Sequence, residues 1–168
     1  MKLQIGGFLD NSLVNGDGIR SVIFVSGCMH SCESCQNEFM QDFNYGDSAS
    51  ISDILQKIKK NMPIIKGVTF SGGEPFESAV VLSKLSEEVR SLGLNIWCYS
   101  GYTFEEIIQG GDSDKLMLLR LIDVLIDGKF DEALKVGASK YTGSSNQRII
   151  DVQKSILENQ IILWNKYI

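Results

Sequence analysis

The sequence predicts an α/β protein built as an open, partial βα barrel. Short apolar segments alternate with longer segments whose apolar residues recur at helical spacing, a pattern typical of a parallel sheet with crossover helices. Eight such units close a barrel of typically about 250 residues, whereas this chain has 168. We therefore expect one domain, residues 1–168, with fewer units and an open sheet.

Four apolar segments are expected to form the central parallel strands, because each is short, rich in β-branched or aromatic residues and followed by polar or glycine residues. They are residues 21–25, 67–70, 95–99 and 124–126. Two minor strands are expected toward the C-terminus, at residues 148–151 and 161–163.

The segments between these strands are expected to form helices. Residues 54–62 have apolar side chains at helical spacing, and Pro63 ends the segment. Residues 80–92 repeat the pattern, with Gly93 as the stop signal. Shorter helices are expected at residues 104–108, 114–122 and 152–158.

Composition narrows the classes of function. The net charge is −5 with no basic stripe, which disfavours direct nucleic-acid binding. No apolar run approaches the ~18 residues of a membrane span, and the first twelve residues lack a signal-peptide core. A cytoplasmic location is therefore expected. Thiols stay reduced there, so metal binding or redox chemistry is a better use of clustered cysteines than disulfides.

Three of the four cysteines, Cys28, Cys32 and Cys35, lie within eight residues. A zinc site completed by His30 is one alternative, but structural zinc sites usually join two separated pairs of ligands. Three thiolates can instead hold three irons of a [4Fe–4S] cluster and leave the fourth iron open, as a catalytic site requires. His30 is then expected to be a loop residue rather than a ligand. Cys98 lies in an apolar strand and is expected to pack as a small hydrophobe.

Other unusual residues also follow predicted strands. They include the segment Ser71, Gly72, Gly73 and Glu74, the pair Ser100 and Gly101, and the pair Asp127 and Gly128. Taken singly, each is explained by a glycine turn or a helix cap. Ligands of parallel α/β folds bind at the carboxyl ends of strands, so we expect these loops and the cysteine loop to share one edge and form one site.

The spacing Cys28-x3-Cys32-x2-Cys35 resembles the cluster signature of the radical S-adenosylmethionine superfamily. This resemblance implies the partial barrel of that superfamily, a [4Fe–4S] cluster on the three cysteines, and S-adenosylmethionine bound at the open iron. The GGE segment is implied to bind the amino group, and the backbone around the third cysteine to lie against the adenine. Many members carry an aromatic residue where this chain has Ser34. The ligand contacts thus implied are Ser34, Cys35, Gln36, Gly72, Gly73 and Glu74.

Further segments indicate which family within this superfamily the chain resembles. NGDGIR at 15–20, WCYSGYTFEE at 97–106, DVLIDGKF at 123–130 and TGSSNQRI at 142–149 resemble the activating proteins of anaerobic (class III) ribonucleoside-triphosphate reductase. Relatives often have DGPGIR at the first of these. The resemblance implies an oxidoreductase that makes a glycyl radical in that reductase, using a low-potential electron donor such as a flavodoxin. The alternatives are an activase of another glycyl-radical enzyme, such as pyruvate formate-lyase, and a non-enzymatic zinc- or cluster-binding module.

Overall fold

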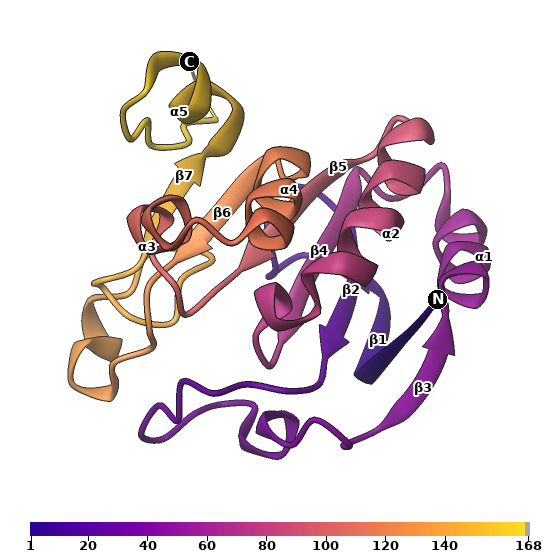
Figure 1. Cartoon of the computed structure of the whole chain (residues 1–168), viewed down its shortest axis with the longest axis horizontal. Helices are drawn as coiled ribbons and strands as arrows, with labels where there is room; N and C mark the ends of the chain where they lie inside the picture. The colour runs from indigo at the N-terminus through magenta and orange to yellow at the C-terminus, as the bar shows by residue number, and fades with distance from the viewer. Residues whose placement is uncertain (167–168) are drawn as a thin grey trace.

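The computed structural model describes residues 1–166, which form a seven-stranded sheet with helices packed against it (Figure 1). The strand order is β3-β1-β2-β4-β5-β6-β7. The four central strands run parallel, as predicted. They are β2 (Arg20–Val25), β4 (Gly67–Gly72), β5 (Asn95–Tyr99) and β6 (Val124–Asp127).

The edges of the sheet are antiparallel. On one side β1 (Lys2–Ser12) pairs with β2, and β3 (Asp47–Ser50) pairs with β1. On the other side β7 (Arg148–Asp151) pairs with β6, as the predicted minor strand. β1 and β3 were not predicted, because β1 contains a Gly-Gly pair and β3 has no apolar alternation. The predicted strand at 161–163 is wrong, since only a single bridge joins Leu163 to Ile150 there.

The predicted helices are present, with boundaries shifted by a few residues. They are α1 (Ile51–Asn61), α2 (Ala79–Ser91), α3 (Phe104–Gly110), α4 (Ser113–Leu121) and α5 (Val152–Glu158). Three short 3-10 helices lie at Glu38–Gln41, Pro75–Ser78 and Glu132–Gly137. Helix α1 begins earlier than predicted because the Ser50 hydroxyl caps it by accepting from the Asp53 amide. None of the described helices has both the length and the apolar character needed to cross a bilayer.

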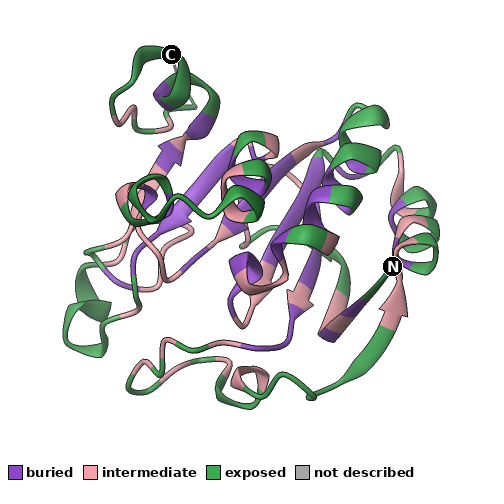
Figure 2. Cartoon of the chain, viewed as in Figure 1, coloured by how far each residue is buried: buried purple, intermediate pink, exposed green. Residues whose placement is uncertain are grey.

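Alternate residues of the central strands face two different environments. In Figure 1, α1, α2 and α4 lie in a row over one face of the sheet. The strand residues packed in this main core are Ile23, Val25, Val68, Phe70, Ile96, Cys98 and Leu125. Figure 2 shows the central strands as largely buried and the outer helix faces as exposed. Cys98 is fully buried within this core, which confirms its predicted role as a small hydrophobe.

The opposite face of the sheet carries a fully buried arginine. Arg20 Nε donates to the Thr69 hydroxyl at 2.8 Å, Nη1 to the Asp17 carbonyl at 3.0 Å, and Nη2 to the Val68 carbonyl at 2.9 Å. Its guanidinium lies 5.4 Å from the centroid of the Trp97 ring. Burial lowers the pKa of Arg20 to about 10, so the side chain remains charged at neutral pH. Arg20 thus fastens the preceding loop to β4.

The same loop carries Asp17, a carboxyl group whose pKa is lowered. Asp17 bonds Lys166 at 2.8 Å and also pairs with Lys66, and these hydrogen bonds lower its pKa from 3.8 to about 2. A depressed folded-state pKa means that the stabilisation is complete above about pH 4 and is lost as the pH falls toward 2. Because both lysines are more than half exposed, we expect a contribution of only about 1–2 kcal/mol.

Urea unfolding of the parent and of Asp17→Asn between pH 5 and pH 2 measures this contribution. The parent is expected to lose about 1–2 kcal/mol more stability over this range than the variant. Glu87→Gln, which removes one member of the exposed pair with Lys84, is the matched control and is expected to follow the parent. Identical pH profiles for the parent and Asp17→Asn would contradict the assignment.

Candidate active site

The cysteine loop leaves the carboxyl end of β2 and is held by its own return segment. The amide of Gly27 donates to the Met40 carbonyl at 2.8 Å, and that of Cys28 to the Gln41 carbonyl at 3.1 Å. Cys28, Cys32 and Cys35 are free thiols, each partly buried. All three line one cavity of about 500 Å³, which is within the ~300–1,000 Å³ range typical of small-molecule sites.

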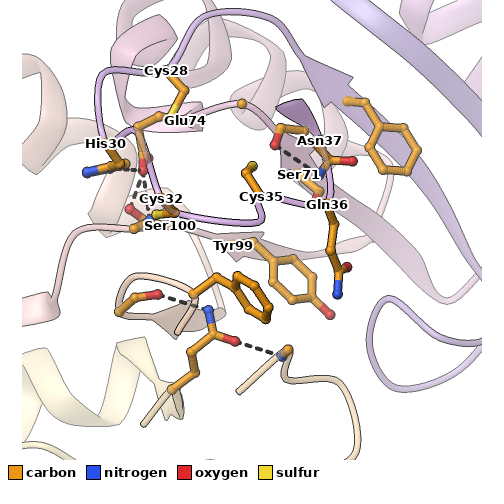
Figure 3. Close-up of a pocket in the computed structure, with 18 of the residues that line it drawn as sticks. Cys28, His30, Cys32, Cys35, Gln36, Asn37, Ser71, Glu74, Tyr99 and Ser100 are labelled. Atoms are coloured by element: carbon orange, nitrogen blue, oxygen red, sulfur yellow. Dashed lines mark hydrogen bonds and ion pairs between the residues drawn. The ribbon is translucent and has the colours of Figure 1, made fainter. Parts of the chain in front are cut away.

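The three thiols are arranged around this cavity, as Figure 3 shows. Within residues 1–166, no three His, Cys, Asp or Glu side chains are grouped so that they could hold one metal ion. Each cysteine of a cubane cluster binds a different iron. Three soft sulfur donors lining one cavity, each available to a different iron, are a donor set that a [4Fe–4S] cluster fits.

The remaining loops predicted to join the site do so. The cavity is also lined by Ser71, Gly72, Gly73 and Glu74 from the end of β4, by Ser100 and Gly101 after β5, and by Gly128 after β6. These loops lie at the carboxyl ends of adjacent parallel strands. The prediction that these loops share one edge is confirmed and they line one cavity, but Asp127 itself is buried and is not among the lining residues.

Glu74 is the single acidic residue among the described residues that line the cavity, and 1% of its surface is exposed. Its Oε1 accepts from the Phe76 amide at 3.0 Å and the Ser100 hydroxyl at 2.9 Å. Its Oε2 accepts from the Gly101 amide at 2.8 Å and lies 2.7 Å from His30 Nε2. A carboxylate offers about four acceptor positions, so protein donors already occupy this side chain.

Gly72 allows the chain to turn at the end of β4. Its φ of +97° is unfavourable for residues with a side chain, and a Cβ there would lie 2.5 Å from the Val25 carbonyl oxygen. The Gly72 carbonyl accepts from Asn37 Nδ2 at 3.1 Å, which joins the end of the cysteine loop to β4. The Gly-Gly pair therefore brings bare backbone to the cavity.

Of the two residues that flank Cys35, only Gln36 lines the cavity. Gln36 lines the cavity beside Cys35 and points toward Tyr99 in Figure 3. Ser34 is exposed, has a φ of +56°, and is not among the cavity-lining residues. Its hydroxyl offers no flat apolar surface, so any aromatic face for a ligand must come from elsewhere in the cavity.

Four aromatic residues that the sequence did not single out line the cavity, and together they are called the aromatic wall: Phe24, Tyr99, Phe130 and Tyr141. The Tyr99 hydroxyl donates to the Tyr141 carbonyl at 2.7 Å, which fixes its ring, and burial raises its pKa. Strand alternation could have pointed to Tyr99. It follows the core residue Cys98 in β5 and therefore faces the other side of the sheet.

The segment TGSSNQRI holds together the two loops that carry Phe130 and Tyr141. Gln147 Oε1 accepts from the Gly143 amide at 2.7 Å, and its Nε2 donates to the Gly128 carbonyl at 2.9 Å. Arg148 bridges buried Asp127 and the α3 residue Glu105, and these hydrogen bonds raise the pKa of Arg148. The polar residues of this motif thus hold the loop after β6 against the loop before β7.

Electrostatics at the first cysteine oppose ionisation in the absence of a metal. Burial raises the pKa of the Cys28 thiol, and the charge of Glu74 adds to this effect. A hydrogen bond from the backbone N–H of His30 to the sulfur acts in the opposite direction. Binding of iron reverses this balance, since a coordinated thiol is deprotonated.

Comparison with known proteins places the chain in a family. Residues 14–150 match the family described as a 4Fe-4S single cluster domain. The chain is 34% identical over 142 residues to the anaerobic ribonucleoside-triphosphate reductase-activating protein of Escherichia coli K12, covering 80% of this chain and 90% of the relative. The phage T4 protein of the same name is 34% identical over 143 residues, covering 81% and 86%.

Among solved structures, QueE from Escherichia coli superposes with a TM-score of 0.53 at 18% identity. The match covers 61% of this chain and 54% of QueE, so it spans about half of that protein. The likeness concerns the fold and confirms the predicted open α/β architecture. The four-iron cluster is the cofactor indicated by the matching family, and the identities above show that this chain belongs to the family of anaerobic ribonucleoside-triphosphate reductase-activating proteins.

Proposed function

We propose that this chain activates an anaerobic ribonucleoside-triphosphate reductase by generating a glycyl radical in it, using S-adenosylmethionine and a [4Fe–4S] cluster. The observation that carries the proposal is the convergence of three partly buried thiols and the GGE turn on one cavity. The reductase is the partner because the relatives named as its activating proteins match this chain over about nine-tenths of their length.

In this proposal the thiolates of Cys28, Cys32 and Cys35 hold three irons. Their number leaves the fourth iron available to the amino and carboxylate groups of S-adenosylmethionine. When bound, the cluster supplies the electron that cleaves this ligand to methionine and a 5′-deoxyadenosyl radical, which takes a hydrogen atom from a glycine of the reductase. The chain's own residues orient the ligand and limit its contact with water.

The ligand contacts belong to the same proposal. Gly72, Gly73 and Glu74 face the amino group through their backbone, because protein donors occupy the Glu74 carboxylate. The backbone of Cys35 and Gln36, which line the cavity, and of the adjoining Ser34, which does not, lies along the adenine. The rings of Tyr99 and Phe130 supply the flat apolar surface that Ser34 lacks.

The proposed radical chemistry also indicates the partner's position, the electron donor and the cellular location. The reductase covers the open side of the cavity while its glycine reacts, since the radical must be shielded from solvent and other hydrogen donors. A low-potential protein such as a flavodoxin supplies the electron. The protein works in the cytoplasm, where its four free thiols stay reduced.

Anaerobic reconstitution with iron and sulfide tests the proposal. The reduced, reconstituted protein is expected to cleave S-adenosylmethionine to methionine and 5′-deoxyadenosine, both measurable by chromatography. Added anaerobic reductase is expected to show a glycyl radical by electron paramagnetic resonance. Tight zinc binding with no cleavage would reject the enzyme. A radical in pyruvate formate-lyase but not in the reductase would reassign the partner.

A further inference from the structure

His30 is the one histidine of the chain and lies inside the cysteine loop, between Cys28 and Cys32. Its side chain is 8% exposed, and its Nε2 is 2.7 Å from Glu74 Oε2. An ionised carboxylate only accepts hydrogen bonds, so Nε2 carries a proton and donates to it. Within residues 28–36, all of them described, this is the only side-chain hydrogen bond to another segment.

The neighbouring residues are shaped to admit the imidazole ring. A Cβ on Gly101 would lie 2.5 Å from His30 Cδ2, so the ring occupies space that only glycine leaves free. The Tyr102 ring meets the imidazole edge-on, with centroids 4.5 Å apart. The ring is therefore held from two sides, and its position depends on the loop after β5.

His30 lies two residues after the first cysteine, and its side chain bonds Glu74. Glu74 in turn bonds Ser100 and Gly101. One buried carboxylate therefore joins the cysteine loop, the GGE turn and the loop after β5, and His30 is the residue by which the cysteine loop enters this network (Figure 3).

We propose that His30 is a positioning residue that, through Glu74, holds the Cys28–Cys32 part of the loop in the arrangement that receives the cluster. The proposal rests on the proposed function only where it concerns the cluster. Both ends of the loop have their own hydrogen bonds, from the Cys28 amide to the Gln41 carbonyl and from Asn37 to the Gly72 carbonyl. Loss of the His30 contact is therefore expected to loosen Cys32, which lies between these two ties, more than Cys28 or Cys35.

The first arm of the test uses the apoprotein and does not depend on the cluster. Each thiol is alkylated with iodoacetamide under reducing, metal-free conditions, and its rate is followed by mass spectrometry. His30→Ala is expected to accelerate labelling of Cys32 about tenfold, with Cys28 and Cys35 less affected and Cys98 slow throughout. His30→Gln places an amide N–H near the position of Nε2 and is expected to restore slow labelling. Unchanged rates in His30→Ala would overturn the proposal.

The second arm uses the reconstituted protein and follows cluster loss to an iron chelator. His30→Ala is expected to lose its cluster about tenfold faster than the parent, the factor expected for the loss of one hydrogen bond. His30→Gln is expected to stay close to the parent. Glu33→Gln, an exposed change in the same loop, is the matched control and is expected to behave as the parent.

The outcomes separate this proposal from the proposed function. If the parent takes up no cluster, the proposed function fails while the alkylation arm still decides the role of His30. If the parent holds a cluster and His30→Ala loses it at the parent's rate, the positioning role is wrong and the function stands. Melting of the apoproteins serves as the fold control. Failure of His30→Gln to rescue a variant that melts like the parent would also reject the proposal.

Discussion

Replacing Cys28, Cys32 or Cys35 singly with alanine is expected to abolish cluster binding and radical formation. Each thiol lines the cavity and is one of only three sulfur donors there, so its loss removes a direct ligand. Loss of a mere hydrogen-bonding partner of a ligand costs about 10- to 100-fold, so we expect a larger effect here. Iron and sulfide content after anaerobic reconstitution, followed by the glycyl-radical signal, measures it.

Cys98→Ala is the matched control for this series. Cys98 is fully buried in the main core, away from the cavity lining. Its loss leaves a small cavity and is expected to cost about 1 kcal/mol of stability while the iron content stays at the parent's level. Complete loss of iron in Cys98→Ala, or retention of a stable cluster in any of the other three variants, would contradict the three-thiolate assignment.

Arg20→Ala is expected to reduce the free energy of unfolding by about 4 kcal/mol, at the high end for single substitutions. The guanidinium is fully buried and donates to four acceptors: Thr69 Oγ1 and the carbonyls of Asp17, Val68 and Asn95. An acceptor left buried without a donor costs about 1–3 kcal/mol. Urea unfolding of the apoproteins measures the loss.

Arg90→Ala provides the comparison, since its side chain is exposed and bonds Asp123 and the Leu121 carbonyl at the surface. It is expected to cost less than about 1 kcal/mol. Arg20→Lys keeps the charge but offers no planar set of five donors, so it is expected to be destabilised nearly as strongly as Arg20→Ala. An Arg20→Ala variant as stable as Arg90→Ala would show that the buried hydrogen bonds contribute little.

The central fold was predictable because its signals are local. Residues 67–70 and 95–99 are short apolar runs, and helix α2 has both its apolar spacing and its glycine stop within one segment. Strands β1 and β3 have no such signal. β3 reads DSAS and is a strand only because it pairs with Lys2–Ile5, a contact across more than forty residues that periodicity does not reveal.

The candidate site was predictable in its loops and less so in its contacts. The three cysteines and the Gly-Gly pair carry distinctive spacing, and strand-end position places them at one edge. The bond from His30 to Glu74 spans 44 residues, and the bond from Tyr99 to Tyr141 spans 42. Such contacts depend on how the loops pack, which is why the sequence left the role of His30 open and did not single out the aromatic wall.

Strand order along the sheet has a consequence for how the protein is made. On one side of β2, β4 pairs with β2 itself, and β5, β6 and β7 each lie next to the strand synthesised just before them, while β1 and β3 complete the other side early. Chains emerge from the ribosome with the N-terminal part first, so the sheet can grow from one edge without threading. The three thiols emerge within the first 35 residues, but Glu74 and Ser100 arrive later. We therefore expect a nascent chain to expose its thiols before it can fix them, so that the loop is ready for iron only once β5 has been added.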